Sequence, residues 1–86
     1  MSGRRSDIQI IGEILRLGET RKTKIMYRVN MSYAQLQRYL KLLLTRGLLE
    51  TVGDEGATPR YRTTEKGREL LKSIDRAMEI LKSKEI

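Results

Sequence analysis

The sequence predicts a mainly α-helical domain that carries a small β-hairpin and ends in a longer C-terminal helix. Three stretches with apolar residues at helical spacing, separated by short polar turns, precede two short strand-like runs. A final helical stretch of about twenty residues follows the second run. A chain of 86 residues is long enough for one compact domain. With 38% apolar and 34% charged residues, it is too apolar for a disordered chain and too charged for a membrane-embedded one.

The first helix is predicted over residues 7–17. Ser6 and Gln9 have the spacing of a capping box, in which each side chain bonds the backbone of the other residue at the start of a helix. Apolar residues then recur at helical spacing until Gly18, a residue suited to end a helix. Residues 18–22 are polar and are expected to form a connector.

A short second helix is expected to begin at a Thr23 cap and to stop near Asn30, a residue that tolerates left-handed backbone. A third helix is predicted over residues 32–46, because Ser32 and Gln35 repeat the capping-box spacing. The apolar residues that should turn this helix toward the core are Leu36, Leu40 and Leu43. Its opposite side is polar and basic.

The hairpin is predicted over residues 48–63, with a polar loop at 53–60 between two short strands. The last helix is expected over residues 65–84, with Thr63 or Thr64 as its cap. Acidic and basic side chains nearly balance in number along this helix. Some oppositely charged pairs lie three residues apart, a spacing that stabilises a helix.

The net charge of +7 is concentrated in one segment. Between Glu19 and Glu50 there is no acidic residue. The seven bases in this interval are Arg21, Lys22, Lys24, Arg28, Arg38, Lys41 and Arg46. The rest of the chain is neutral in sum. Such a concentration indicates a binding surface for a polyanion, although a basic surface without a partner is the alternative.

Helix, short helix, tight turn, basic helix, hairpin and helix is the element order of a winged helix-turn-helix. We expect a flexible basic tail at residues 1–6, the winged helix-turn-helix domain at 7–63 and a dimerisation helix at 64–86. The third helix then presents its outer face to a DNA major groove, and the hairpin forms the wing.

Four short motifs occur in order along residues 8–71. They are Thr23 with Ile25, Met26 and Tyr27; Ser32 and Tyr33 with Leu36, Tyr39 and Leu40; Gly47 with Leu48; and Thr64 with Glu65, Lys66 and Gly67. With these motifs the sequence resembles the archaeal winged-helix DNA-binding proteins, which include small transcriptional regulators and dimeric chromatin proteins. The resemblance implies a dimeric DNA-binding protein of the cytoplasm, associated with the nucleoid, whose third helix contacts the DNA.

The candidate DNA-binding residues lie around the second helix, on the outer face of the third helix and on the wing. They are Arg21, Lys22, Lys24, Tyr27, Arg28, Tyr33, Ala34, Gln37, Arg38, Lys41, Arg60 and Arg62. Arginine pairs with guanine through two hydrogen bonds, and Gln37 or Gln35 can do the same with adenine. The basic side chains can also neutralise phosphates. For each residue, the alternative is an ordinary solvated or packed surface position.

The last helix has more apolar residues than one small domain can cover. The candidate dimerisation residues are Leu71, Ile74, Met78 and Leu81. We expect them to meet the same helix of a second chain across a two-fold axis. The alternative is a helix that only packs against the first helix.

These observations predict sequence-specific binding of double-stranded DNA by a homodimeric transcriptional regulator. A low-specificity chromatin-organising protein and a winged-helix protein-interaction module are the alternatives. Without cysteine or histidine the chain lacks the common nucleophile and base pairs, so an enzyme, a metal site or another cofactor is not expected. No small-molecule ligand is evident, and the longest uncharged stretch, nine residues at 29–37, is too short to enter a membrane as a helix.

Overall fold

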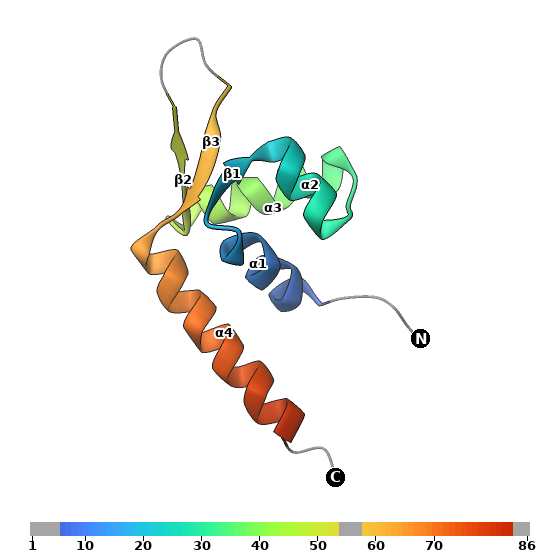
Figure 1. The fold of residues 1–86 in the computed structure, drawn as a ribbon, viewed down its shortest axis with the longest axis vertical. Helices are drawn as coiled ribbons and strands as arrows, with labels where there is room; N and C mark the ends of the chain where they lie inside the picture. Colours follow the sequence, from blue (N-terminus) through green and yellow to red (C-terminus); the bar gives the residue numbers. More distant parts are fainter. Residues whose placement is uncertain (1–5, 54–57, 84–86) are drawn as a thin grey trace.

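A computed structural model describes residues 6–53 and 58–83. The elements follow in the order α1 (Asp7–Arg16), β1 (Glu19–Arg21), α2 (Lys22–Val29), α3 (Tyr33–Thr45), β2 (Leu49–Val52), β3 (Arg60–Thr63) and α4 (Glu65–Ser83). In Figure 1, the first three helices gather beside a narrow upright sheet, and α4 leaves the base of the sheet and runs diagonally past α1. The predicted class, mainly helical with a small β-hairpin, is confirmed. The expected tail at 1–5, the middle of the wing loop at 54–57 and the end of the last helix at 84–86 lie outside the described residues.

Both predicted capping boxes are present. Ser6 Oγ accepts a hydrogen bond from the Gln9 backbone N–H at 3.2 Å at the start of α1. Ser32 Oγ accepts one from the Gln35 backbone N–H, also at 3.2 Å, at the start of α3. In each box the glutamine Oε1 accepts a hydrogen bond from the backbone N–H of the serine. These two helices therefore begin where local sequence places them.

The second helix begins differently from the prediction. It starts at Lys22 after an extended Arg21, and no side chain caps it, so the Thr23 cap was wrong. The reason is that β1 runs directly into α2, which leaves no room for a separate capping turn. The end is as predicted, because Asn30 takes a left-handed conformation with φ 55°.

The sheet has three strands where the sequence predicted two. Its order is β1-β3-β2, and both neighbours pair with β3 in antiparallel fashion. Residues 19–21, which were expected to be part of a polar connector, form the extra strand β1. Glu19 lies opposite Arg62 and Arg21 opposite Arg60. These three residues carry no apolar alternation, so only the partner strand reveals that they are a strand.

The hydrophobic core lies where the first three helices, the base of the sheet and α4 meet. Its most deeply buried side chains are Ile14, Leu15, Ile25, Val29, Leu36 and Leu43. Thr63 is buried with them and donates its hydroxyl to the Leu15 carbonyl at 2.7 Å. Thr64 is the residue that caps α4, since its Oγ1 accepts from the Gly67 N–H at 3.0 Å. One threonine therefore anchors the sheet to α1, and the next begins α4.

The first half of α4 packs along α1. Ile74 is 6% exposed and belongs to the core. A bidentate ion pair joins the two helices, with Arg16 donating to both carboxylate oxygens of Asp75 at 3.1 and 2.6 Å. These hydrogen bonds lower the pKa of Asp75 below its usual value. Towards its end α4 is more open, with Ile80 51% and Leu81 65% exposed.

Candidate nucleic-acid interface

Helix α3 has one buried and one exposed face, as the sequence predicted. Its buried side chains are Leu36, Leu40 and Leu43. Its exposed side chains include Ala34, Gln37, Arg38, Lys41 and Thr45. Ser32 and Gln35 set the start of the helix, and the spacing of the three leucines decides which side chains reach the surface.

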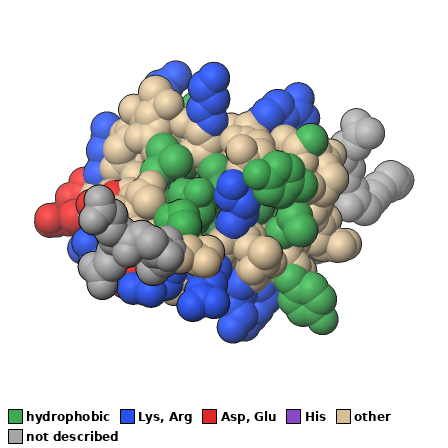
Figure 2. Space-filling view, turned by 90° about the horizontal axis from the view of Figure 1, so that it is seen from above, with side chains coloured by type: hydrophobic (Ala, Val, Ile, Leu, Met, Phe, Trp, Pro, Cys, Tyr) green, Lys and Arg blue, Asp and Glu red, His purple; other side chains and the backbone are tan. Residues whose placement is uncertain are grey.

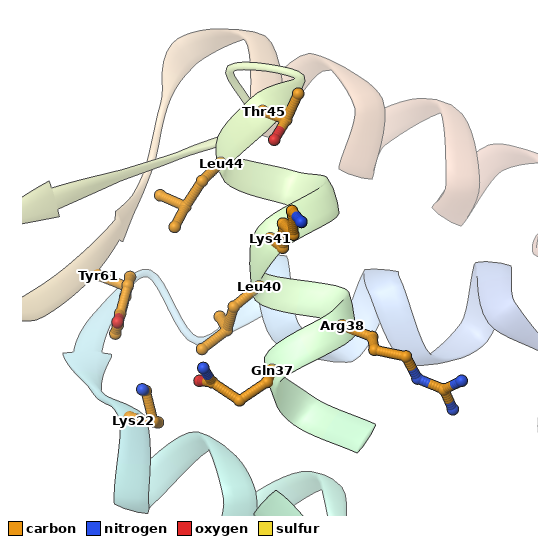
Figure 3. Close-up of a pocket in the computed structure, with 8 residues that line it drawn as sticks. All are labelled: Lys22, Gln37, Arg38, Leu40, Lys41, Leu44, Thr45 and Tyr61. Atoms are coloured by element: carbon orange, nitrogen blue, oxygen red, sulfur yellow. The ribbon is translucent and has the colours of Figure 1, made fainter. Parts of the chain in front are cut away.

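A groove of about 510 Å³ separates α3 from the sheet. Its lining residues are Lys22, Gln37, Arg38, Leu40, Lys41, Leu44, Thr45 and Tyr61, drawn in Figure 3. Two leucines of α3 and the ring of Tyr61 form an apolar floor, and the charged groups among these residues are all positive. The groove is therefore suited to a ligand with negative charges and apolar carbon in between.

Lys22 and Tyr33 contact each other at the rim of this surface. The Lys22 ammonium lies 3.4 Å from the Tyr33 hydroxyl, to which it donates, and 5.0 Å from the centre of the ring. Both were candidates from sequence, but their pairing was not foreseen. Lys22 is the first residue of α2 and Tyr33 the first of α3, and their long side chains reach each other across the space between the two helix starts. The cation–π geometry holds the ammonium near the groove.

A second hollow, of about 410 Å³, lies at the start of α2. It is lined by Thr20, Arg21, Thr23, Lys24 and Arg60. The structure thus brings Arg21 and Lys24 together with Arg60 of the wing. Since no side chain caps α2, its first N–H groups remain available to an anion.

Tyr27 and Arg28 lie further along α2. Tyr27 is 85% exposed, and Arg28 is also exposed. Neither lines the groove beside α3 or the hollow at the start of α2. The structure therefore does not place these two candidates with the others, and their role stays a prediction.

The two wing arginines are engaged in ion pairs. Arg60 Nε lies 2.9 Å from a carboxylate oxygen of Glu19, and Arg62 Nε lies 2.8 Å from one of Glu50. The hydrogen bond to Glu50 raises the pKa of Arg62 above its usual value. Successive residues of a strand point to opposite faces, so both arginines lie on the face of the sheet opposite to Tyr61. They do not share the groove with Arg38 and Lys41.

The candidate dimerisation residues are divided by the fold. Leu71, Ile74 and Met78 pack against the core of their own chain, whereas Leu81 is exposed. A Cβ placed on Gly12 would lie 3.4 Å from Ile74 and 3.9 Å from Leu71, which shows how closely α1 approaches α4. Part of the predicted dimer stripe thus serves the domain itself.

Seen from the end that carries the wing, Figure 2 shows apolar side chains in the middle of the surface. Lys and Arg side chains lie between and around them, and acidic side chains gather at one edge. Among the described residues, no group of three or more His, Cys, Asp or Glu side chains is arranged to hold a metal ion. Within the same part of the chain, no helix combines the length and apolar character needed to cross a membrane.

Solved structures with the same fold come from archaea and bacteria. Sso10a-2, a DNA-binding protein from Sulfolobus solfataricus, matches with a TM-score of 0.81 at 27% identity, over 92% of this chain and 84% of that chain. The MarR family transcriptional regulator SPO1453 from Silicibacter pomeroyi matches with a TM-score of 0.71 at 21% identity, over 90% of this chain and 55% of that chain. The second likeness is one of fold alone.

Sequence comparison agrees with the structural likeness. Residues 4–82 match the family described as winged helix-turn-helix. The chain is also 31% identical over 84 residues to the uncharacterised protein MJ0287 of Methanocaldococcus jannaschii. The aligned region spans 94% of this chain and 81% of that protein. Element order, sheet topology and these matches lead to one conclusion: the chain belongs to the winged helix-turn-helix family.

Proposed function

We propose that this protein binds double-stranded DNA in a sequence-specific manner and acts as a homodimeric transcriptional regulator in the cytoplasm, on the nucleoid. The observation that carries the proposal is the exposed face of α3, where Arg38 and Lys41 lie one turn apart inside a segment without acidic residues. The same fold occurs in Sso10a-2, which is a DNA-binding protein. In a winged helix-turn-helix this helix is the one that enters the major groove.

Each part of the surface has a role in this proposal. Arg38 pairs with guanine at base edges, and the small Ala34 allows close approach of the first turn of α3 to the bases. Lys41 and the bases around the start of α2 neutralise phosphates. The wing, β2 and β3, lies beside the neighbouring stretch of the duplex. Base contacts then supply specificity, while phosphate contacts supply most of the affinity.

The test is a selection of genomic DNA fragments by the purified protein at moderate salt. A few strongly enriched sites, with half-sites about one helical turn apart or a multiple of it, support a dimeric regulator. Even recovery of all fragments identifies instead a chromatin-organising protein, in which charge and DNA shape dominate. If no duplex is bound, the winged-helix protein-interaction module becomes the better proposal.

The dimer is proposed to form through the exposed end of α4. Leu81 is the most exposed of the candidate residues, and Leu71 and Met78, which are only partly buried, lie on the same side of the helix by their spacing. Ile74 contributes little, because it is already buried within its own chain. Two such helices, paired across a two-fold axis, cover apolar surface that a single chain leaves in water.

Replacing Leu81 by aspartate should therefore abolish the dimer without unfolding the domain. Analytical ultracentrifugation at micromolar concentration is expected to give twice the chain mass of 10.0 kDa for the wild type and 10.0 kDa for Leu81→Asp. Lys82→Asp is the control, since it places a carboxylate at the neighbouring exposed position. A wild-type protein that sediments at 10.0 kDa contradicts the dimer.

Freeing the wing arginines should strengthen DNA binding. In Glu19→Gln and Glu50→Gln the carboxylates that hold Arg60 and Arg62 are lost, and each arginine can turn to a phosphate. The slope of log affinity against log salt is expected to steepen by up to about 0.9 for each arginine. Glu79→Gln on α4 changes the net charge equally and is the control. An equal gain in the control would show that net charge alone is responsible.

A further inference from the structure

We infer that Lys22, Gln37 and Tyr61 form a subsite for one phosphodiester of the DNA backbone, so that Gln37 contacts phosphate and does not read a base. The three residues come from α2, α3 and β3 and line the same groove. The inference rests on the proposed DNA binding. It adds that one DNA strand lies between α3 and the wing.

The convergence of the three side chains is visible in Figure 3. The Gln37 amide extends from α3 towards Lys22 at one end of the groove, and the Tyr61 ring lies across from α3 with Leu40 between them. Arg38 extends in a different direction, away from this end. Arg38 therefore remains the candidate base reader, although it neighbours Gln37 in sequence. The helix face alone suggests Gln37 as an adenine reader, whereas the sheet opposite places its amide in the groove.

The polar groups at this end are available to a ligand. Among the described residues, neither the Gln37 amide nor the Tyr61 hydroxyl has a hydrogen-bond partner. Lys22 uses one of its three N–H donors on the Tyr33 hydroxyl, at 3.4 Å, and keeps two. A phosphodiester offers oxygen acceptors and a single negative charge, which these donors can satisfy together.

The floor of the groove indicates a sugar–phosphate chain in preference to a small free anion. Leu40, Leu44 and the Tyr61 ring supply apolar surface beside the donors. A deoxyribose has carbon atoms to place there, whereas a free hydrated anion gains nothing from such contact. Lys41, a turn beyond Gln37 on α3, lines the same groove and can meet a second phosphate of the strand.

Tyr33 is a positioning residue for the Lys22 ammonium. Its hydroxyl and ring hold the Lys22 ammonium at the rim of the groove, which reduces the conformational freedom that the long lysine side chain would lose on binding. Tyr33 itself does not line the groove.

The test measures binding to a panel of duplexes of different sequence, at several salt concentrations, for single variants. Tyr61→Phe and Gln37→Ala should each weaken binding about tenfold to every duplex, because a hydrogen bond to a charged phosphate is lost. Their salt slope should stay that of the wild type, since neither residue carries a charge. Lys22→Ala should weaken binding and reduce the slope by about 0.9.

Tyr39→Phe is the matched control for the loss of a tyrosine hydroxyl. Tyr39 donates to Asp7 at 2.6 Å and does not line the groove, so its variant should bind DNA as the wild type does. Thermal unfolding of each variant confirms that it is folded, which is expected of Tyr61→Phe because its hydroxyl bonds nothing in the described chain.

The outcomes separate this inference from the proposed function. If the wild type binds no duplex, both fail. If the wild type binds but Tyr61→Phe and Gln37→Ala bind equally well, the phosphodiester subsite is wrong and the DNA-binding proposal stands. If Gln37→Ala changes the order of preference among the duplexes, Gln37 reads a base and the inference is overturned.

Discussion

Replacing Gly67 by alanine is expected to destabilise the protein by about 3 kcal/mol, a large part of the stability of a small domain. Gly67 lies buried in the first turn of α4. A Cβ at this position would lie within 2.8 Å of Thr63 Cγ2 and closer still to the Leu48 carbonyl oxygen. The Leu48 carbonyl is held because it accepts a hydrogen bond from the Thr64 N–H at 3.1 Å, and the Thr63 side chain is held because its hydroxyl donates to the Leu15 carbonyl at 2.7 Å.

The sign of this effect is decided by the tertiary contact, since alanine favours a helix over glycine by about 1 kcal/mol. Chemical denaturation followed by circular dichroism gives the free energy of unfolding. Gly12→Ala is the control, because it makes the same change in a buried turn of α1, where the new Cβ would meet Ile74 at an ordinary 3.4 Å. We expect Gly12→Ala to be close to neutral. Equal losses in the two variants would contradict the clash with the Leu48 carbonyl.

The double variant Arg38→Ala and Lys41→Ala is expected to lose most of the DNA affinity. Arginine at a base edge contributes about 1–3 kcal/mol, and a lysine on a phosphate adds a further electrostatic share. Because Lys41 is proposed to neutralise a phosphate and Arg38 to contact a base edge, the salt slope is expected to fall by about 0.9. Titration of a labelled duplex at several salt concentrations measures both quantities. The fold should be unaffected, since both side chains are exposed.

Lys72→Ala with Arg76→Ala is the matched control. It removes the same two charges from neighbouring turns of α4, at exposed positions outside the groove. Under the proposal it keeps nearly all of the affinity. A double variant at 38 and 41 that binds as well as this control would exclude α3 as the DNA-contacting helix.

The helices follow from sequence because their signals are local. The capping boxes at Ser6 and Ser32 act within three residues, and the left-handed Asn30 ends α2 where the sequence places it. The buried face of α3 repeats within four residues. Such patterns can be recognised without knowing what the helix will touch.

The errors concern features that depend on distant partners. β1 exists because residues 19–21 find the backbone groups of β3, about forty residues away along the chain. Thr63 was a possible helix cap, yet its hydroxyl bonds the Leu15 carbonyl 48 residues earlier. Because β1 ends at Arg21, α2 begins at Lys22 without a side-chain cap.

By itself, the sequence determined the class of fold, the helix starts at the two capping boxes and the concentration of basic residues between Glu19 and Glu50, because each depends on neighbouring residues or on composition. Only the tertiary structure decided the third strand, the ion pairs that hold Arg60 and Arg62, and the groove that brings Gln37 towards Tyr61. These features need side chains and backbone groups from separate elements at contact distance, and that proximity is produced when the core closes.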